Sequence, residues 1–430
     1  MLSEQPKSSV SNILLNTSTT THHTKLRTMK QLKLLILGAS LTQLPIIKKA
    51  VELGYYVITL DNIPNNIGHT FSHKSINCST ADQIGVLKLA QQLNINGITT
   101  FASDIATPTV ALVAESLNLP SCSLSTTKIL ANKANFRVFQ EKNNLPHPSF
   151  FISKNVSDID KIPTHLTTPL IFKPIDTSGS RGITKVEEFN LNHYHDAFRH
   201  AQQYSRSKTV SIEKLIIGTD VSGDGFLING KLYAFITQKY KNNFIPIGHS
   251  LPNNISTENE QRILNTVEQT CHAAEYFNGP IDFDANISEQ HTIIIEMSPR
   301  LGGNGIPELI HYHTGIDLIE MSIEYALGKP LKTPLEPIPT ASCGSYIFGS
   351  EEVGQLEYIA SKEEILEHIP ILLKYQLNYT QGDTIPTFDH SGNSLGYALF
   401  AYSPEESYAQ IVSRLQAALQ LRITTQQPTA

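Results

Sequence analysis

The chain has 430 residues and a formal net charge of −6, with a mass of 47.6 kDa and a pI near 6.2. At roughly 150 residues per domain this length predicts about three domains, and the mild acidity argues against a nucleic-acid-binding protein. Only 17% of the residues are charged, and no like-charged run or membrane-length apolar stretch occurs. We therefore expect a multi-domain cytoplasmic protein.

Four cysteines are too far apart to form a C-x-x-C pair: Cys78, Cys122, Cys271 and Cys343. This spacing favours neither a zinc site nor a disulfide framework, so we expect incidental thiols in a reducing compartment. Residues 1–30 are rich in Ser and Thr and lack a signal-peptide core, which predicts a disordered leader. Met29 directly precedes the first expected strand, so an upstream start codon could have added this leader.

Strand-like and helix-like segments alternate after the leader. The expected strands are Leu34–Leu37, Tyr56–Leu60 and Gly97–Phe101, and the expected helices are Leu44–Leu53, Gln83–Leu93 and Thr107–Leu117. This alternation predicts a Rossmann-like parallel sheet with right-handed crossovers. A dinucleotide site is disfavoured, because Gly38–Gln43 supplies a single glycine where the phosphate-binding turn needs three. Asp61 could suit a ribose hydroxyl, but a lone acid at a strand end is common.

The pattern changes from Ser125 onward. One helix is expected over Thr126–Lys142, a second over Pro307–Leu327 and a last one from about Pro404 to Leu419. Strands are expected at Leu170–Lys173, Val210–Leu215, Phe226–Ile228, Leu232–Thr237 and Ile293–Glu296, with Asn229-Gly230 as a turn.

Two clusters of residues in this part suit phosphate and nucleotide binding. Lys173 ends an apolar strand and precedes a loop of small residues, Asp176–Gly182, whose N–H groups can surround phosphate oxygens. A flexible surface hairpin explains the same residues equally well. Glu213–Ile216 offers an edge strand to an adenine ring and Asp220 a carboxylate to a ribose. By itself, an ordinary strand and turn is the simpler reading of that cluster.

Two further clusters suit metal and carboxylate binding. Asp282 and Glu296 lie within apolar strand-like runs, where an unpaired charge is costly, so they could converge on magnesium. A buried salt bridge, for instance to Arg300, is the competing explanation. Arg300 is followed by Leu301–Gly305, and a guanidinium suits a carboxylate or an acyl-phosphate. A plain glycine-rich connector is the alternative there.

The order of these motifs resembles the ATP-grasp superfamily. The residues that carry the resemblance are Lys133, Lys173 with its Ser-Gly loop, Glu213-Lys214-Leu215-Ile216, Asp282 and Glu296-x-Ser-x-Arg300. Within the superfamily the chain is most similar to carboxylate–amine ligases and to the biotin carboxylase and carbamoyl-phosphate synthetase branch. The resemblance covers about Lys33 to Tyr402. It implies a mixed α/β and α+β protein with a Rossmann-like pre-ATP-grasp domain (31–123), an ATP-grasp domain (124–330) and a small β-rich C-terminal cap (331–430).

The resemblance also implies roles for individual residues. The nucleotide-binding residues are Lys133, Lys173, Ser178, Gly179, Ser180, Gly182, Glu213, Lys214, Leu215, Ile216 and Asp220. Asp282, Glu296 and Ser298 are implied as magnesium ligands, although the family commonly has Asn at the Ser298 position. Arg300 and Arg181 are implied as catalytic residues. Arg300 and the N–H groups of Gly302–Gly305 are expected to stabilise an oxyanion.

The implied activity is that of an ATP- and magnesium-dependent ligase, with manganese as a possible substitute. It would activate a small-molecule carboxylate as an acyl-phosphate and join it to an amine. The acceptor pocket is expected near Ser103-Asp104 and His249–Asn254, and a homodimer would be common among relatives. A bicarbonate-using carboxylase is a close alternative. An inactive ATP-binding sensor or scaffold is another, and a dinucleotide-dependent oxidoreductase is disfavoured.

Overall fold

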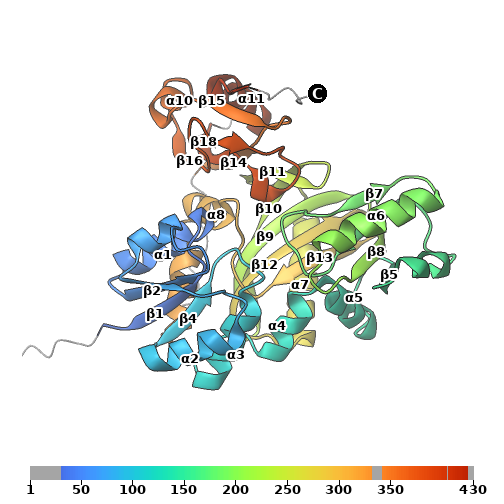
Figure 1. Cartoon of the computed structure of the whole chain (residues 1–430), viewed down its shortest axis with the longest axis horizontal. Coiled ribbons are helices and arrows are strands. Elements are labelled where there is room, and N and C mark those ends of the chain that lie inside the picture. Colours follow the sequence, from blue (N-terminus) through green and yellow to red (C-terminus); the bar gives the residue numbers. More distant parts are fainter. Residues whose placement is uncertain (1–30, 332–340, 404, 425–430) are drawn as a thin grey trace, which may run out of the picture. The chain divides into compact units, whose positions relative to one another are not determined.

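The computed structural model of the chain describes residues 31–331, 341–403 and 405–424 (Figure 1). The expected leader and Met29 lie outside the described residues, as does part of the expected C-terminal cap. The described residues from Leu32 onward belong to one compact unit. The mixed α/β architecture is confirmed, and the domain boundaries after residues 123 and 330 stay predictions. None of the described helices has the length and apolar character that a membrane crossing requires.

A parallel four-stranded sheet follows the leader, as the alternating pattern predicts. Its strands pair in the order β3-β2-β1-β4. They are β1 (Lys33–Leu37), β2 (Tyr56–Asp61), β3 (Lys74–Asn77) and β4 (Gly97–Thr100). The accompanying helices are η1 (Leu41–Gln43), α1 (Leu44–Glu52), η2 (Ile67–Phe71), α2 (Gln83–Leu93) and α3 (Thr107–Leu117). Strand β3 was not predicted from the sequence, because three of its four residues are exposed and it contains no apolar run.

Two short helices replace the single helix expected over Thr126–Lys142. They are α4 (Leu124–Leu130) and α5 (Lys133–Lys142). The expectation is wrong because Asn132 caps a new helix, its side chain accepting a hydrogen bond from the Asn135 N–H. The break puts Lys133 at the start of α5.

A second, four-stranded antiparallel sheet follows, with the order β5-β8-β6-β7. Its strands are β5 (Phe150–Ser153), β6 (Leu170–Pro174), β7 (Thr184–Val186) and β8 (Val210–Lys214). The helix η3 (Val156–Lys161) and the helix α6 (Leu191–Tyr204) share an apolar core with it, in which Phe172 meets Phe198 and Tyr194. The sheet thus presents β6 and β8 as neighbours.

The large sheet is antiparallel and has eight strands in the order β13-β12-β9-β10-β11-β14-β18-β16. Their bounds are β9 (Thr219–Ile228), β10 (Lys231–Asn242), β11 (Ile245–Leu251), β12 (Gly279–Ile287), β13 (Thr292–Ser298), β14 (Ser342–Phe348), β16 (Leu372–Leu377) and β18 (Gly396–Tyr402). The predicted Asn229-Gly230 turn joins β9 to β10, with positive φ at both residues. Helix α7 (Thr257–Ala273) packs against β10, β12 and β13. Strands expected in the cap therefore continue this sheet through the β11–β14 pair.

Helices α8 (Ile306–Thr314) and α9 (Leu318–Ala326) occupy the stretch for which one helix was expected. That expectation is wrong because Gly315, at φ +76°, ends α8, and the Asp317 side chain caps α9. Both helices pack against β1 and α1 in one apolar core.

The C-terminal residues add a three-stranded sheet, in the order β17-β15-β19, and the helices around it. These elements are β15 (Gly354–Tyr358), α10 (Lys362–His368), β17 (Thr384–Ile385), η4 (Ser391–Asn393), α11 (Tyr408–Leu419) and β19 (Arg422–Thr424). Helix α11 begins later than expected because Ser407 and Gln410 form a capping box at its start.

Candidate active site

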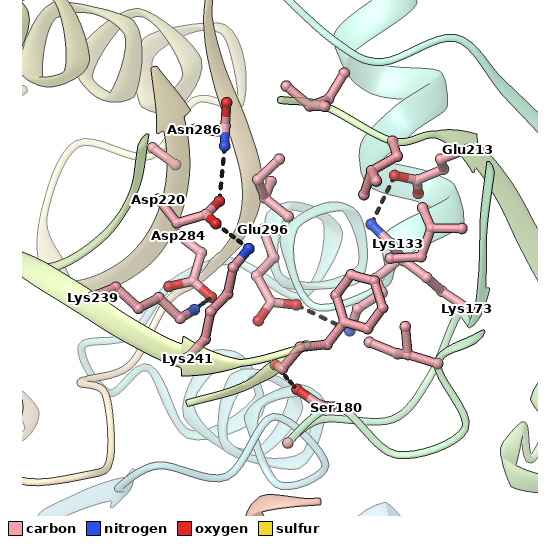
Figure 2. A pocket seen from close by; sticks show the side chains of 18 of the residues that line it. Lys133, Lys173, Ser180, Glu213, Asp220, Lys239, Lys241, Asp284, Asn286 and Glu296 are labelled. Carbon is pink, nitrogen blue, oxygen red and sulfur yellow. Dashed lines mark hydrogen bonds and ion pairs between the residues drawn. The ribbon is translucent and has the colours of Figure 1, made fainter. Parts of the chain in front are cut away.

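A charged cleft of about 140 Å³ lies between the second sheet and the large sheet (Figure 2). Acidic and basic side chains meet in it as pairs. The charged residues that line the cleft are Lys133, Lys173, Arg181, Glu213, Lys214, Asp220, Lys239, Lys241, Asp284 and Glu296. We call this cavity the charged cleft. Most of the residues that the motifs single out therefore converge, although they come from five separate stretches of the chain.

Glu213, Lys173 and Arg137 form a buried ion triad at the cleft. Glu213 on β8 accepts hydrogen bonds from Lys173 on β6, at 2.9 Å, and from Arg137 on α5, at 3.1 Å. Burial alone would raise the pKa of Glu213, but the two cations outweigh it and lower that pKa to about 2. Burial lowers the pKa of Lys173. Both oxygens of the Glu213 carboxylate are thus engaged within the protein, and this side chain is not free to meet a ligand.

Lys133 joins the two walls of the cleft. Its ammonium donates to the Thr177 carbonyl at 2.7 Å and pairs with Glu296 on β13 at 3.0 Å. Lys133 lowers the pKa of Glu296 to about 2, against the effect of burial. The lysine therefore holds the loop after β6 close to the large sheet.

That loop, Thr177–Ile183, is held from two further sides. The Ser180 hydroxyl donates to the Phe244 carbonyl at 2.6 Å, and the Ser391 N–H donates to the Gly179 carbonyl at 3.0 Å. Positive φ at Gly179, Ser180 and Gly182 gives the tight turn that exposes backbone N–H groups.

The loop residues do not all face the charged cleft. Gly179, Ser180 and Arg181 line it, whereas Ser178 lines a neighbouring cavity. A Cβ at Gly182 would meet the Tyr204 ring at 2.8 Å, so this glycine permits packing.

The open end of the cleft carries a second set of ion pairs. Asp220 pairs with Lys241 and accepts a hydrogen bond from the Asn286 amide at 2.8 Å. Asp284 pairs with Lys239 at 2.5 Å. Figure 2 shows these two pairs side by side, facing Glu296. The expected ribose-binding acid, Asp220, thus sits on the rim.

The three expected magnesium ligands lie on adjacent strands. Asp282 on β12 is directly opposite Ser298 on β13, two residues from Glu296. Burial raises the pKa of Asp282 to about 7, although Arg300 opposes the shift. The Ser298 hydroxyl is buried and has no hydrogen-bond partner among the described residues. Two carboxylates and one orphaned hydroxyl oxygen fit a hard divalent cation, although no group of three His, Cys, Asp or Glu converges in the described chain.

Arg300 lies in the neighbouring cavity of about 250 Å³, which we call the arginine cavity; Lys133 and Glu296 also line it. Its guanidinium donates to Asp104 through Nε, at 2.8 Å, and also through Nη2, and it pairs with Asp282. The salt bridge weighed as the alternative for Asp282 is therefore present. A ligand carboxylate at Arg300 would have to compete with Asp104.

Gly302 cannot supply an oxyanion donor, which corrects that expectation. Its N–H donates to Asp224 at 2.7 Å, and both are buried. A Cβ at this position would approach Asp282 and Asp224 to within 3 Å, so glycine is required by close contact.

A third cavity, of about 1010 Å³, lies beyond the glycine loop. It is lined by Gly303–Gly305 and Glu308, by residues of 40–67 together with Phe101, and by residues of 347–397. We call it the large cavity.

His249 and Asp61, two further residues considered from the sequence, are both engaged within the fold. His249 is 1% exposed within β11, and burial lowers its pKa to about 3, so it cannot contact a substrate. Asp61 accepts hydrogen bonds from the N–H groups of Ala39 and Ile63, both at 2.9 Å. These bonds use the carboxylate within its own loop, in line with the disfavoured dinucleotide site.

Sequence reasoning missed several residues of the site: Arg137, Asp224, Lys239, Lys241 and Asp284. A signal existed for Asp284, because it stands two positions after Asp282 on the same strand face. Arg137 gave none, because one arginine in an amphipathic helix looks like a surface residue.

Comparisons with known proteins agree with this geometry. Residues 166–308 match the family described as the ATP-grasp domain, which confirms the resemblance. A carbamoyl phosphate synthase large chain from Thermoanaerobacter sp. is 25% identical over 229 residues, 52% of this chain but only 21% of that protein.

Two solved structures share the fold. An L-amino acid ligase from Bacillus licheniformis has a TM-score of 0.79 at 22% identity, covering 92% of this chain and 99% of that one. The biotin carboxylase domain of a Hydrogenobacter thermophilus 2-oxoglutarate carboxylase, in complex with MgADP, ADP and bicarbonate, has a TM-score of 0.71 at 14% identity. It covers 91% of this chain and 90% of that one.

Proposed function

We propose that this chain, which carries an ATP-grasp domain over residues 166–308, is an ATP-dependent ligase that joins a carboxylate to an amine. The observation that supports this most strongly is the convergence of Lys133, Lys173 and the Gly179–Arg181 loop opposite Glu296. Lysines and loop N–H groups bind phosphate oxygens, and a carboxylate opposite them suits a phosphate-bound cation.

ATP would lie along the charged cleft. The backbone of Lys214–Ile216 would receive the adenine, and Asp220 on the rim the ribose. Lys133 and Lys173 would hold the phosphates, with Gly179 and Ser180 covering them. Lys173 is paired with Glu213 and Lys133 with Glu296 in the structure, so phosphate binding would draw both ammonium groups partly away from these carboxylates.

Asp282, Glu296 and Ser298 would hold magnesium, or manganese, whose charge would neutralise the phosphates and favour in-line transfer. Glu296 is ionised over the whole physiological range, because its pKa is about 2. The orphaned Ser298 hydroxyl would gain a partner there.

The reaction has two steps. An oxygen of the substrate carboxylate attacks the γ-phosphorus, the bond to the β-phosphate oxygen breaks, and ADP leaves. The amine nitrogen then attacks the acyl carbon, the bond from that carbon to the phosphate oxygen breaks, and the amine loses its proton to solvent. The products are an amide and inorganic phosphate.

Arg300 would orient the carboxylate, because a guanidinium fork bonds two oxygens at once. Asp104 occupies that fork in the ligand-free protein, so binding would exchange one carboxylate for another. Arg181 lines the charged cleft and would meet developing phosphate charge. The loop Thr177–Ile183 would exclude water from the acyl-phosphate.

Bicarbonate is the second candidate carboxylate, because a neighbour in fold is a biotin carboxylase domain in complex with bicarbonate. The product of the first step would then be carboxyphosphate. All other residue roles would be unchanged.

The test is an ADP-release screen of the full chain over pairs of carboxylates and amines, with mass detection of products. We expect ADP only when ATP, magnesium, one acid and one amine are all present, with an amide of matching mass. ADP release that requires bicarbonate instead of an organic acid supports the second candidate. ATP binding without ADP release from any pair would contradict the ligase function.

A further inference from the structure

We infer that the large cavity binds the amine substrate and selects an amine without a phosphate group. This inference rests on the proposed ligase function. It concerns a cavity separate from the charged cleft, and it follows from the position of that cavity and from the charges around it.

The large cavity adjoins the place where the acyl-phosphate would form. Arg300 lines the arginine cavity, and Gly303, three residues later, lines the large cavity. Three residues of extended chain span at most about 10 Å. A Cβ at Gly303 would meet Ala102 at 3.2 Å, so glycine lets this loop approach the residues after β4 closely. A nucleophile bound beyond the glycine loop can therefore reach an acyl group held at Arg300.

The charges in the lining are one-sided. Among the described residues that line the large cavity there are two carboxylates, Glu308 and Glu364, and no Lys, Arg or His. Lys374 bonds Glu308 and lies over the Tyr397 ring, so the one cation beside this lining is already paired, and Lys374 itself lines a different cavity. A dianionic phosphate would have to enter with no cationic partner, at a large desolvation cost.

Helix starts are the other means by which proteins bind phosphate, and those of α8 and α10 at this cavity are already occupied by acids. Glu308 stands in the first turn of α8, and Glu364 stands in the first turn of α10. Glu364 also accepts the Ser361 N–H at 2.7 Å in a capping box. Each carboxylate cancels the positive end of its helix and takes the place an anion would occupy.

The lining instead suits a polar, uncharged or cationic body. Amide and hydroxyl side chains from several stretches line the cavity, among them Thr42, Asn66, Gln376 and Thr380. One oxygen of Glu308 receives Lys374 at 3.0 Å, and the other has no partner among the described residues. An ammonium or N–H group of the amine would donate a hydrogen bond to this second oxygen of Glu308. At about 1010 Å³, the cavity lies at the upper end of the range of about 300–1,000 Å³ for small-molecule sites.

The experiment compares matched amines in the ADP-release assay, with the carboxylate held constant. The pairs are glucosamine and glucosamine 6-phosphate, ethanolamine and O-phosphoethanolamine, and L-serine and O-phospho-L-serine. For any pair that is turned over, we expect kcat/KM at least about tenfold higher for the phosphate-free member. A preference for the phosphorylated member would overturn the inference while leaving the ligase function intact. No ADP from any amine would overturn the ligase function, and this inference with it.

Charge reversal at the cavity gives a second readout. Glu308→Lys should shift the ratio of kcat/KM within each pair about tenfold toward the phosphorylated member, and Glu308→Gln should shift it less in the same direction. Because the ratio does not depend on the fraction of folded enzyme, lost stability cannot imitate this result. Glu320→Lys is the matched control, since Glu320 also stands in the first turn of a nine-residue helix but is exposed. An unchanged ratio in Glu308→Lys, or an equal shift in Glu320→Lys, would overturn the inference.

Discussion

The charged cleft and the large cavity are built in opposite ways. The cleft of about 140 Å³ is crowded with acids and bases in fixed pairs. The cavity of about 1010 Å³ has mostly neutral polar walls and two carboxylates. Preformed ion pairs hold lysines and acids in position before a ligand arrives, which suits a ligand of constant charge such as ATP. Mostly neutral walls with two carboxylates suit the phosphate-free amine inferred above.

Breaking the ion triad behind the cleft should have the largest effect. Arg137→Met leaves Glu213 with one cation in place of two, and the free energy of unfolding should fall by about 3–5 kcal/mol. Urea unfolding measures it. Arg199→Met, in an exposed pair with Asp196, is the matched control and should change that free energy by less than about 0.5 kcal/mol. Equal losses in both variants would show that burial of the triad is unimportant.

Removing the acid opposite the lysines should affect catalysis instead. Glu296→Gln takes away the partner of Lys133 and one expected magnesium ligand, so kcat for ADP formation should fall by about 10²–10³. Glu289→Gln, an exposed position in the same β12–β13 hairpin, should retain full activity. Circular dichroism checks that both variants are folded. Wild-type turnover in Glu296→Gln would refute the assigned role.

The ion triad of Glu213, Lys173 and Arg137 also predicts that the free energy of unfolding depends on pH. The pKa of Glu213 is about 2 in the folded chain against an ordinary value of 4.5. A lowered pKa stabilises the fold above the ordinary value, and this stability is lost as the pH falls toward 2. Between pH 5 and pH 3 the loss from this group should be about 2 kcal/mol. Urea unfolding at both pH values should show a correspondingly smaller loss in Glu213→Gln. The same pH dependence in both proteins would contradict the assignment.

The smallest effect is expected in the large cavity. Tyr379→Phe removes one hydroxyl from a neutral lining, so kcat/KM for the amine should change by no more than about tenfold. The KM for ATP should stay the same, since Tyr379 does not line the charged cleft. Steady-state kinetics with each substrate varied in turn separates the two. A raised KM for ATP would show that the two sites are not independent.

The sequence predicted the cleft far better than the cavity, for a physical reason. Lys173 and Glu296 stand within apolar strand-like runs, where an unpaired charge would be costly to bury. Such residues can therefore be recognised from one sequence. The lining of the large cavity is mostly neutral and comes from stretches over 300 residues apart, such as Ser40 and Tyr397. No local pattern distinguishes such residues from an ordinary surface.

The errors in the predicted helices have local causes. Helical periodicity continued through Asn132 and Gly315, although a capping side chain and a left-handed glycine ended the helices there. The error at Gly302 has a long-range cause. Its N–H donates to Asp224, which lies 78 residues earlier on β9, and the sequence does not show that these two residues meet. Long-range pairing of this kind decides the geometry of the site, and a single sequence does not display it.

The central claim is that ATP activates the carboxylate by phosphoryl transfer in the charged cleft. The most direct measurement uses the acid found in the screen, labelled with oxygen-18 in its carboxylate, followed by mass spectrometry of the released phosphate. Attack on the γ-phosphorus and later loss of phosphate carries one labelled oxygen into each phosphate molecule. We expect that single transfer in the wild-type chain, and the same labelling at a rate about 10²–10³ lower in Glu296→Gln. Unlabelled phosphate, formed together with amide, would contradict it.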